Sequence, residues 1–413
     1  MAGQHNAGKE TYLDYIRSVR FAQAYTECCG LFAEYSGTLP VSQITKLRSV
    51  LNLTHDEFSL VLRLAEGEYH AKRKGKYVEG CLTLREMMEQ STHPGIARRH
   101  ATQFAGCNHV LELCTGSGTD TRAIAANATN VSTIERNPLY AALAEYGYAQ
   151  LGICNITQLC GDAAMFLRQT DTIQFDGLWA DPERRTEQRR VSTNAHEYQP
   201  PLSVIMNVPV RRVKGIKIAP AITLSDAVLN NQWRREWVGY DTDCREQVLW
   251  SGTAIQDGTV YVAQSEVEWI PTLNTVHAAS IVVDSSRHTT LQYICEPHPC
   301  LIRSGHLQEF YAEKSIALLD EHIAYGCSDI CTQHPLLTWF HVHRVLPFSA
   351  SNLQQGVSDA GWNSSTEIKK RGIEQLPDAL HKRIRWAKSD VNGTIICCRA
   401  VPHSLLFFCT RIL

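Results

Sequence analysis

The stretch VLELCTGSGTD, residues 110–120, decides the fold of this chain. Its first four residues have the pattern of a short apolar strand, and TRAIAANA (121–128) behind it has the pattern of a helix. Between them lies a Gly-x-Gly turn, which lets backbone N–H groups approach a ligand closely because neither glycine carries a side chain. The stretch therefore predicts a strand–turn–helix unit with a ligand bound over the turn.

The same alternation of strand and helix continues beyond this unit. VSTIE (131–135) is expected to be the second strand, and a helix is expected from Pro138 to Gly147. Three more strand-like runs follow, namely ITQLC (156–160), FDGLWA (175–180) and VKGIKIA (213–219). Strands that alternate with helices at this spacing predict an α/β fold whose sheet is doubly wound and mostly parallel.

Acidic residues close several of these strands. Glu135 ends the second strand 17 residues after Gly118, where a carboxylate can accept both ribose hydroxyls of an adenosyl group. Asp162 follows the third strand, and Asp181 follows the fourth. The glycine pattern is E-L-x-x-G-x-G, with Thr121 in the place of the third glycine of a dinucleotide site. The pattern therefore favours an adenosylmethionine site, and a nicotinamide oxidoreductase stays a distant alternative.

The runs LELCTGSGTDT, IERN, GDA and FDGLWADPERR resemble class I methyltransferases that use S-adenosyl-L-methionine (AdoMet). More narrowly, the chain is similar to a bacterial group with a THUMP-like C-terminal domain, through LREMMEQSTHPGIARRHATQFAG before the turn and YICEPHPCLIRSG far beyond it. The resemblance implies a Rossmann-like class I methyltransferase core within a chain of four parts. The expected parts are an N-terminal helical region (1–100), the core (101–226), a small ferredoxin-like α+β domain (227–338) and the THUMP-like domain (339–413).

Carried over residue by residue, the resemblance implies a set of AdoMet contacts at the glycine turn and the strand ends. These are Glu112, Gly116, Gly118, Asp120, Glu135, Asp162 and Asp181.

The resemblance also points to residues that act on the substrate. Asp181 could orient the methyl acceptor or take its proton. Arg184 and Arg185 fall on the family's D-P-x-R-R segment and could clamp a phosphate or carboxylate of the substrate, with Arg189 and Arg190 extending that surface. The alternative is a structural turn in which these arginines form ion pairs with Glu183 and Glu187.

Several local patterns lie outside the glycine turn. Capping boxes at Thr54/Glu57 and Thr83/Glu86 predict two helix starts, and GHLQEFYAEKSIALLDEHIA (305–324) predicts a further helix. Lys217 at the end of the fifth strand and His196 after the arginine turn are within reach of the expected cleft. For both, a packing or surface role is the favoured interpretation.

Composition is that of a folded protein, with 413 residues, 44% hydrophobic and 20% charged, and a net charge of −2. From Trp339 to Leu413 there are ten Lys/Arg against five Asp/Glu, so this tail is at +5 and the rest at −7. No run is apolar and long enough to span a membrane, and the first residues lack the apolar part of a secretion signal, so we expect a cytoplasmic protein.

The fifteen cysteines include no C-x-x-C pair. Because Cys327, Cys331 and His334 match no zinc motif, no metal is expected.

The sequence thus predicts an AdoMet-dependent methyltransferase that acts on RNA (tRNA or rRNA), held by the basic C-terminal domain and the arginine-rich turn. Two alternatives stay open: a small-molecule or protein methyltransferase, and a non-catalytic RNA-binding protein with a vestigial AdoMet pocket. Arg184 stands where methyltransferases of exocyclic base amines usually carry an aromatic residue, which disfavours that chemistry. Pyrimidine C5 methylation is disfavoured because Cys295 and Cys300 lie far along the chain with no visible base.

Overall fold

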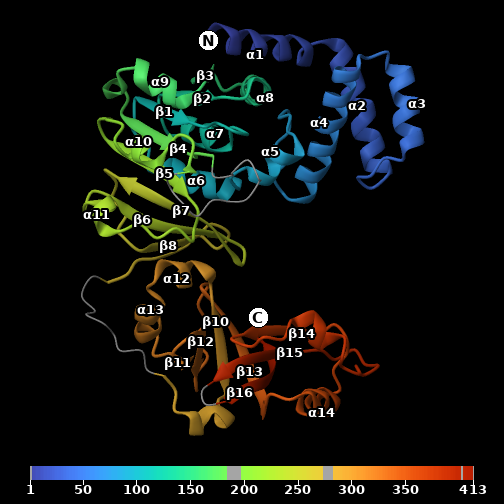
Figure 1. The fold of residues 1–413 in the computed structure, drawn as a ribbon, viewed down its shortest axis with the longest axis vertical. Helices are drawn as coiled ribbons and strands as arrows, with labels where there is room; N and C mark the ends of the chain where they lie inside the picture. Colours follow the sequence, from blue (N-terminus) through green and yellow to red (C-terminus); the bar gives the residue numbers. More distant parts are fainter. Residues whose placement is uncertain (1, 184–196, 273–281, 401–402, 413) are drawn as a thin grey trace. The chain divides into compact units, whose positions relative to one another are not determined.

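The computed structural model describes residues 2–183, 197–272, 282–400 and 403–412, drawn as ribbons in Figure 1. The chain divides into two compact units. The first comprises Met1–Arg235 and Glu246–Ile255, and the second comprises Glu236–Arg245 and Gln256–Leu413. No helix among the described residues is both long and apolar enough to cross a membrane.

Helices α1 to α6 precede the first strand, and the apolar faces of α1 to α5 share a core with α8 of the following domain. The predicted capping box of α4 is confirmed, because the Thr54 hydroxyl accepts the N–H of Glu57 and the Glu57 carboxylate accepts the N–H of Thr54. The second predicted box is wrong: Leu84, not Thr83, precedes α5, and its side chain is fully buried. The helices are α1 Ala2–Ile16, α2 Val19–Glu34, α3 Val41–Leu51, α4 His55–Arg73, α5 Arg85–Gln90 and α6 Pro94–Thr102.

The predicted α/β core follows, and its doubly wound, mostly parallel sheet is confirmed. In the first unit the strand order is β3-β2-β1-β4-β5-β7, with β1 parallel to both β2 and β4, and β7 antiparallel to β5. The strands are β1 His109–Leu113, β2 Asn130–Glu135, β3 Ile156–Cys160, β4 Gly177–Ala180, β5 Val213–Ile218 and β7 Asp243–Ser251, the last belonging to this unit from Glu246 onward. The helices are α7 Thr119–Ala125, α8 Pro138–Gln150, α9 Ala163–Gln169, α10 Leu202–Met206 and α11 Asp226–Leu229.

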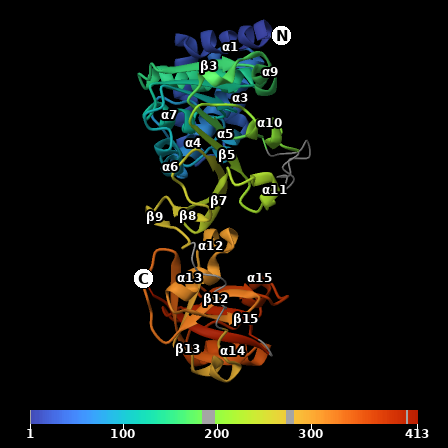
Figure 2. The same cartoon turned by 90° about the vertical axis from the view of Figure 1, so that its left-hand side faces the viewer.

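Helices cover both faces of this sheet, which is why its strands are nearly continuous apolar runs. Helices α9 and α10 lie on one side and α7 and α8 on the other, and α1 lies along β3 (Figures 1 and 2). The strand order reverses between β1 and β4, since β2 and β3 extend one way and β5 the other. Ligands of open α/β sheets bind at such a reversal, beyond the carboxyl ends of the strands.

A glycine in β5 makes room for two tryptophans on the neighbouring strands. The register places Gly215 between Trp179 of β4 and Trp250 of β7. A Cβ atom at Gly215 would lie 2.4 Å from the Trp250 ring and 2.7 Å from the Trp179 ring. The two indoles, with centroids 5.7 Å apart, form an aromatic layer, and the His100 ring of α6 packs 4.4 Å from Trp179. This layer fixes the position of His100.

The second unit holds a seven-stranded sheet of order β11-β12-β10-β13-β16-β15-β14. Its strands are β10 Tyr293–Pro297, β11 Ala317–Asp320, β12 Ile323–Ser328, β13 Leu337–Pro347, β14 Glu367–Arg371, β15 Thr394–Ala400 and β16 His403–Arg411. In the same unit, β8 (Thr259–Val262) pairs with β9 (Val267–Trp269) and with β6 (Arg234–Tyr240) over residues 236–239. The helices are α12 Pro299–Ser304, α13 Leu307–Glu313, α14 Ala350–Ala360 and α15 Pro377–His381.

The predicted helix over 305–324 is wrong. Helix α13 covers only its first part, and the chain then turns into strands β11 and β12. Ser315 adopts a positive φ of 55°, which interrupts the helix, and Leu318 and Leu319 beyond it are buried as strand residues. The predicted division at 338/339 stays a prediction, although β13 begins at Leu337 and pairs with β10 from the segment before it.

Candidate cofactor and active site

Backbone hydrogen bonds bring four strand ends together at one edge of the sheet. The N–H of Asp181, after β4, donates to Leu113 O at the end of β1 (3.3 Å). The N–H of Gly161, after β3, donates to Glu135 O at the end of β2 (2.9 Å). These bonds place Asp181 and Glu135 on either side of the glycine turn that follows β1.

The two glycines of the turn have different tasks. Both adopt positive φ, 54° at Gly116 and 69° at Gly118, which glycine adopts without strain. A Cβ at Gly118 would lie 2.4 Å from the Tyr148 hydroxyl, so this glycine is needed for packing. A Cβ at Gly116 would meet no atom within 4 Å. The turn therefore faces open space at Gly116, where a ligand can approach the backbone.

Glu135 lies against this turn and is only 9% exposed. Its carboxylate accepts the N–H of Gly116 (3.0 Å) and the N–H of Asn137 (2.8 Å). Burial raises the pKa of Glu135, and the two backbone N–H groups oppose that rise. Each carboxylate oxygen keeps a second lone pair, so the group can accept hydroxyls of a ligand over the turn. Asp162 lies after β3, where it caps α9 by accepting the N–H of Met165 (2.8 Å).

Two of the predicted cofactor contacts lie beneath the open edge. Glu112 is 2% exposed, and burial, with Asp120 nearby, raises its pKa to about 8. Asp120 has both carboxylate oxygens engaged by the protein, one by His100 Nδ1 (2.8 Å) and one by the Thr92 hydroxyl (2.5 Å). The structure thus brings Gly116, Glu135 and Asp181 together at the edge, while Glu112 and Asp120 belong to its buried support.

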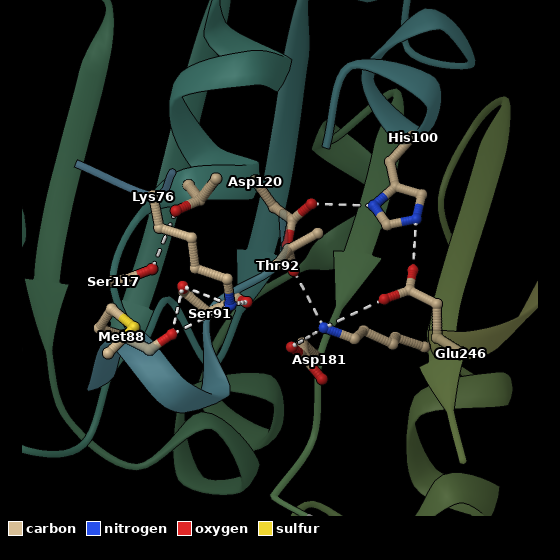
Figure 3. A network of polar contacts seen from close by, with 11 residues as sticks. Lys76, Met88, Ser91, Thr92, His100, Ser117, Asp120, Asp181 and Glu246 are labelled. Atoms are coloured by element: carbon tan, nitrogen blue, oxygen red, sulfur yellow. Dashed lines mark hydrogen bonds and ion pairs between the residues drawn. The ribbon is translucent and has the colours of Figure 1, made fainter. Parts of the chain in front are cut away.

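Asp120 belongs to a network of buried polar side chains beneath this edge (Figure 3). The His100 ring lies between Asp120 and Glu246, with Nε2 2.6 Å from Glu246 Oε1. This contact is a buried ion pair when His100 is protonated. The ammonium of Lys217 lies 2.8 Å from Asp181 Oδ2 and 3.4 Å from Glu246 Oε2, and donates to the Thr92 hydroxyl (2.9 Å).

Thr92, His100 and Glu246 are functional candidates that sequence reasoning missed. The segment that carries Thr92 and His100 is part of the family resemblance, but neither residue has a spacing that marks it, and Glu246 lies on a later strand. The favoured interpretation of Lys217 as a packing residue stays a prediction: the side chain is buried, and its ammonium contacts the Asp181 carboxylate.

Several predicted residues lie outside the described part of the chain. These are Arg184, Arg185, Glu187, Arg189, Arg190 and His196. Glu183, at the border, forms an ion pair with Arg136 (3.0 Å). Across the described ranges, no group of three or more His, Cys, Asp or Glu side chains is arranged to hold a metal ion. Cys295 is fully buried, and burial raises its pKa.

The fold is the Rossmann-like fold of class I methyltransferases, followed by a THUMP-like domain. Residues 337–411 match the family model described as THUMP domain-like. Over nearly the whole chain, the structure is similar to a crystal structure of a protein from Porphyromonas gingivalis W83 that is provisionally named a methyltransferase. The TM-score is 0.72 at 18% identity, covering 93% of this chain and 98% of that one.

Other similarities are weaker. The 16S rRNA N2 G1207 methyltransferase of T. thermophilus, solved with AdoMet and guanosine, has a TM-score of 0.31 at 15% identity, covering 40% of this chain and 44% of that one. The tRNA (m1A58) methyltransferase of Aquifex aeolicus has a TM-score of 0.28 at 14% identity, covering 40% and 71%. No curated protein matches the sequence.

Proposed function

We propose that this chain is an AdoMet-dependent methyltransferase and that its substrate is RNA. The observation that carries the proposal is the buried Glu135 carboxylate beside the open glycine turn, at the point where the strand order reverses. This arrangement fits an adenosyl ligand, because the turn leaves space at Gly116 and the carboxylate can accept ribose hydroxyls. When bound, AdoMet supplies a methyl group on a sulfonium that is ready for in-line transfer.

The residues of the chain would then bind and orient. Gly116 and Glu135 would hold the sugar end of the cofactor, and Asp162, after the neighbouring strand, would lie on the adenine side. Asp181 has a side chain that is 25% exposed and would face the methyl acceptor. Holding donor and acceptor in line is the main contribution that such a site makes to the rate.

The second unit supports RNA as the substrate. Lys382, Arg383, Arg385 and Lys388 are exposed, and no ion pair to a carboxylate is found for them within the described residues. The His381 and Trp386 rings pack together beside them, with centroids 4.6 Å apart. Unpaired cations next to an aromatic pair suit a phosphate backbone with unstacked bases. We name this surface, residues 381–388, the basic face.

The cofactor assignment is tested by calorimetric titration of the full chain with AdoMet and with S-adenosylhomocysteine. We expect micromolar binding of both, and Glu135→Ala should weaken binding at least about tenfold because a buried hydrogen-bonding carboxylate is lost. Glu79→Ala, which removes an exposed carboxylate elsewhere, is the control and should bind normally.

Substrate class is tested by transfer of tritiated methyl groups from AdoMet to total RNA. Transfer that is lost in Asp181→Ala supports RNA methylation. Binding of AdoMet without transfer to RNA would favour a small-molecule or protein substrate. If a folded sample bound RNA but not AdoMet, the proposed activity would be wrong, and a non-catalytic RNA-binding protein would be the better description.

A further inference from the structure

We propose that Lys217 is a positioning residue, which holds the Asp181 carboxylate in place and connects it to the helix of the glycine turn through Glu246, His100 and Thr92. The inference rests on the proposed function, since Asp181 is the residue expected to face the methyl acceptor. It adds residues from α6, β5 and β7 to a site otherwise built from the ends of β1 to β4.

The contacts form a closed ring. Starting at Asp120, the chain of contacts passes through His100 (2.8 Å), then Glu246 (2.6 Å), then Lys217 (3.4 Å). From the Lys217 ammonium it returns through the Thr92 hydroxyl (2.9 Å) to Asp120 (2.5 Å). Asp181 is attached to this ring at Lys217 (2.8 Å). A ring gives every member at least two partners, so no single side chain can rotate away without breaking two contacts.

The loop that carries Thr92 is itself anchored. The ammonium of Lys76 donates to the carbonyls of Met88 (3.1 Å) and Ser91 (2.7 Å), next to Thr92 in the chain (Figure 3). These hydrogen bonds hold the backbone next to Thr92, so the Thr92 hydroxyl has a fixed position in the ring.

Charge and burial indicate that the ring serves the site rather than stability alone. His100 is 0% exposed, and the side chains of Glu246 and Lys217 are 3% and 4% exposed. Burying several charges costs more free energy than packing apolar side chains of the same size, so such a network is weak as a stabilising device. Asp181, at 25%, is the member whose carboxylate reaches an open surface. The network therefore ends at the face where the acceptor is expected.

The buried histidine contributes a second positive charge. Burial opposes protonation of His100, but the Glu246 and Asp120 carboxylates outweigh it and raise the pKa of His100 to about 10. At neutral pH an imidazolium and an ammonium therefore face three carboxylates, namely Asp120, Glu246 and Asp181. This near balance lets Asp181 be held by Lys217 without leaving Glu246 unpaired.

The test compares Lys217→Met, Lys217→Arg and the control Lys214→Met in the full chain. Lys214 lies on the same strand, and its half-buried ammonium donates to the carbonyls of Met206 (2.8 Å) and Val208 (3.3 Å), outside the ring. For each variant, AdoMet affinity is measured by calorimetry, the thermal midpoint by circular dichroism, and methyl transfer to total RNA at saturating AdoMet.

We expect Lys217→Met to lower the transfer rate by about 10- to 100-fold, because a small misplacement of a positioning group has an effect of that size. Its AdoMet affinity should stay within about threefold of the unaltered chain. Lys217→Arg, which keeps the charge, should recover most of the rate. Lys214→Met should keep the full rate, even if it lowers the thermal midpoint as much as Lys217→Met does.

Equal transfer rates in Lys217→Met and the unaltered chain would overturn the inference. So would an arginine variant no better than the methionine variant, or a rate loss matched by Lys214→Met. Failure of the unaltered chain to bind AdoMet or to transfer methyl groups would instead remove the proposed function, and with it this role for Lys217.

Discussion

At the scale of single residues, the acidic side chains near the glycine turn form two groups, those with an open side and those covered by the protein. Glu135 and Asp181 keep an open side and can meet a ligand. Glu112 and Asp120 have the same chemistry but are covered by the protein. The Asp120 carboxylate binds the His100 and Thr92 side chains. The sequence could predict all four as acidic residues near the turn, but it could not separate these environments, because burial depends on α6 and β7, which come from elsewhere in the chain.

Replacing Glu112 with Gln should make the free energy of unfolding less dependent on pH. Burial raises the pKa of Glu112 from 4.5 to about 8, so the folded chain keeps a proton that the unfolded chain releases. The resulting stabilisation is complete below about pH 4.5 and is lost as pH rises through about 8. Glutamine mimics the neutral acid and should remove this contribution, which is on the order of a few kcal/mol.

Urea unfolding at pH 5 and at pH 8.5 measures the effect, with Glu79→Gln as an exposed control. The unaltered chain and the control should lose more stability between the two pH values than Glu112→Gln does. The same loss in all three proteins would show that Glu112 is ionised in the folded chain.

At the scale of elements, strand and helix positions in the core follow from local patterns, and the errors occur where long-range contacts decide. The apolar runs at 110–113, 156–160 and 213–219 are strands as predicted. The segment 305–324 has a helical pattern, yet its second half forms β11 and the start of β12, which pair with each other in the sheet. The spacing of apolar residues alone cannot distinguish a helix from a strand here, because a short apolar run is compatible with either a buried strand or a short helix.

Gly215→Ala should destabilise the first unit. The added Cβ would lie 2.4 Å from Trp250 and 2.7 Å from Trp179, in a layer that cannot move without displacing His100. Overpacking of this kind costs about 1–3 kcal/mol. Gly30→Ala in α2 is the control, because a Cβ there meets no atom within 4 Å and alanine favours a helix.

Chemical denaturation of both variants measures the difference. We expect a lower midpoint for Gly215→Ala and an unchanged or slightly higher midpoint for Gly30→Ala. A Gly215→Ala protein as stable as the unaltered chain would mean that the two tryptophans are not closely packed in solution.

At the scale of the whole molecule, the basic face of the second unit can be tested independently of the chemistry. Reversing two charges there, Lys382→Glu with Arg385→Glu, should weaken binding to total tRNA at least about tenfold near 0.1 M salt. The slope of log affinity against log salt should fall by about two, since each cation that contacts a phosphate contributes about one.

A matched control reverses two other exposed charges of the same unit, Arg287→Glu with Arg344→Glu. These guanidiniums already pair with Asp329 and Asp359. The net charge changes equally in both double variants. Their RNA affinities should therefore differ only if RNA binds specifically at the basic face. Filter binding over a range of salt concentrations measures it, and equal losses would show that RNA responds to net charge rather than to the basic face.

By itself, the sequence determined the order of strands and helices in the core, the glycine turn and the acidic residues that close the strands. These features follow from local sequence patterns, namely the spacing of apolar residues, the glycines of the turn and the lengths of the apolar runs. Only the tertiary structure decided that Glu246 and His100 meet, that Lys217 contacts Asp181, and that Gly116 rather than Gly118 faces open space. The partners in these contacts lie up to 146 residues apart in the sequence. They come together because β5 pairs with β4 on one side and with the antiparallel β7 on the other, while His100 of α6 packs against Trp179 of β4.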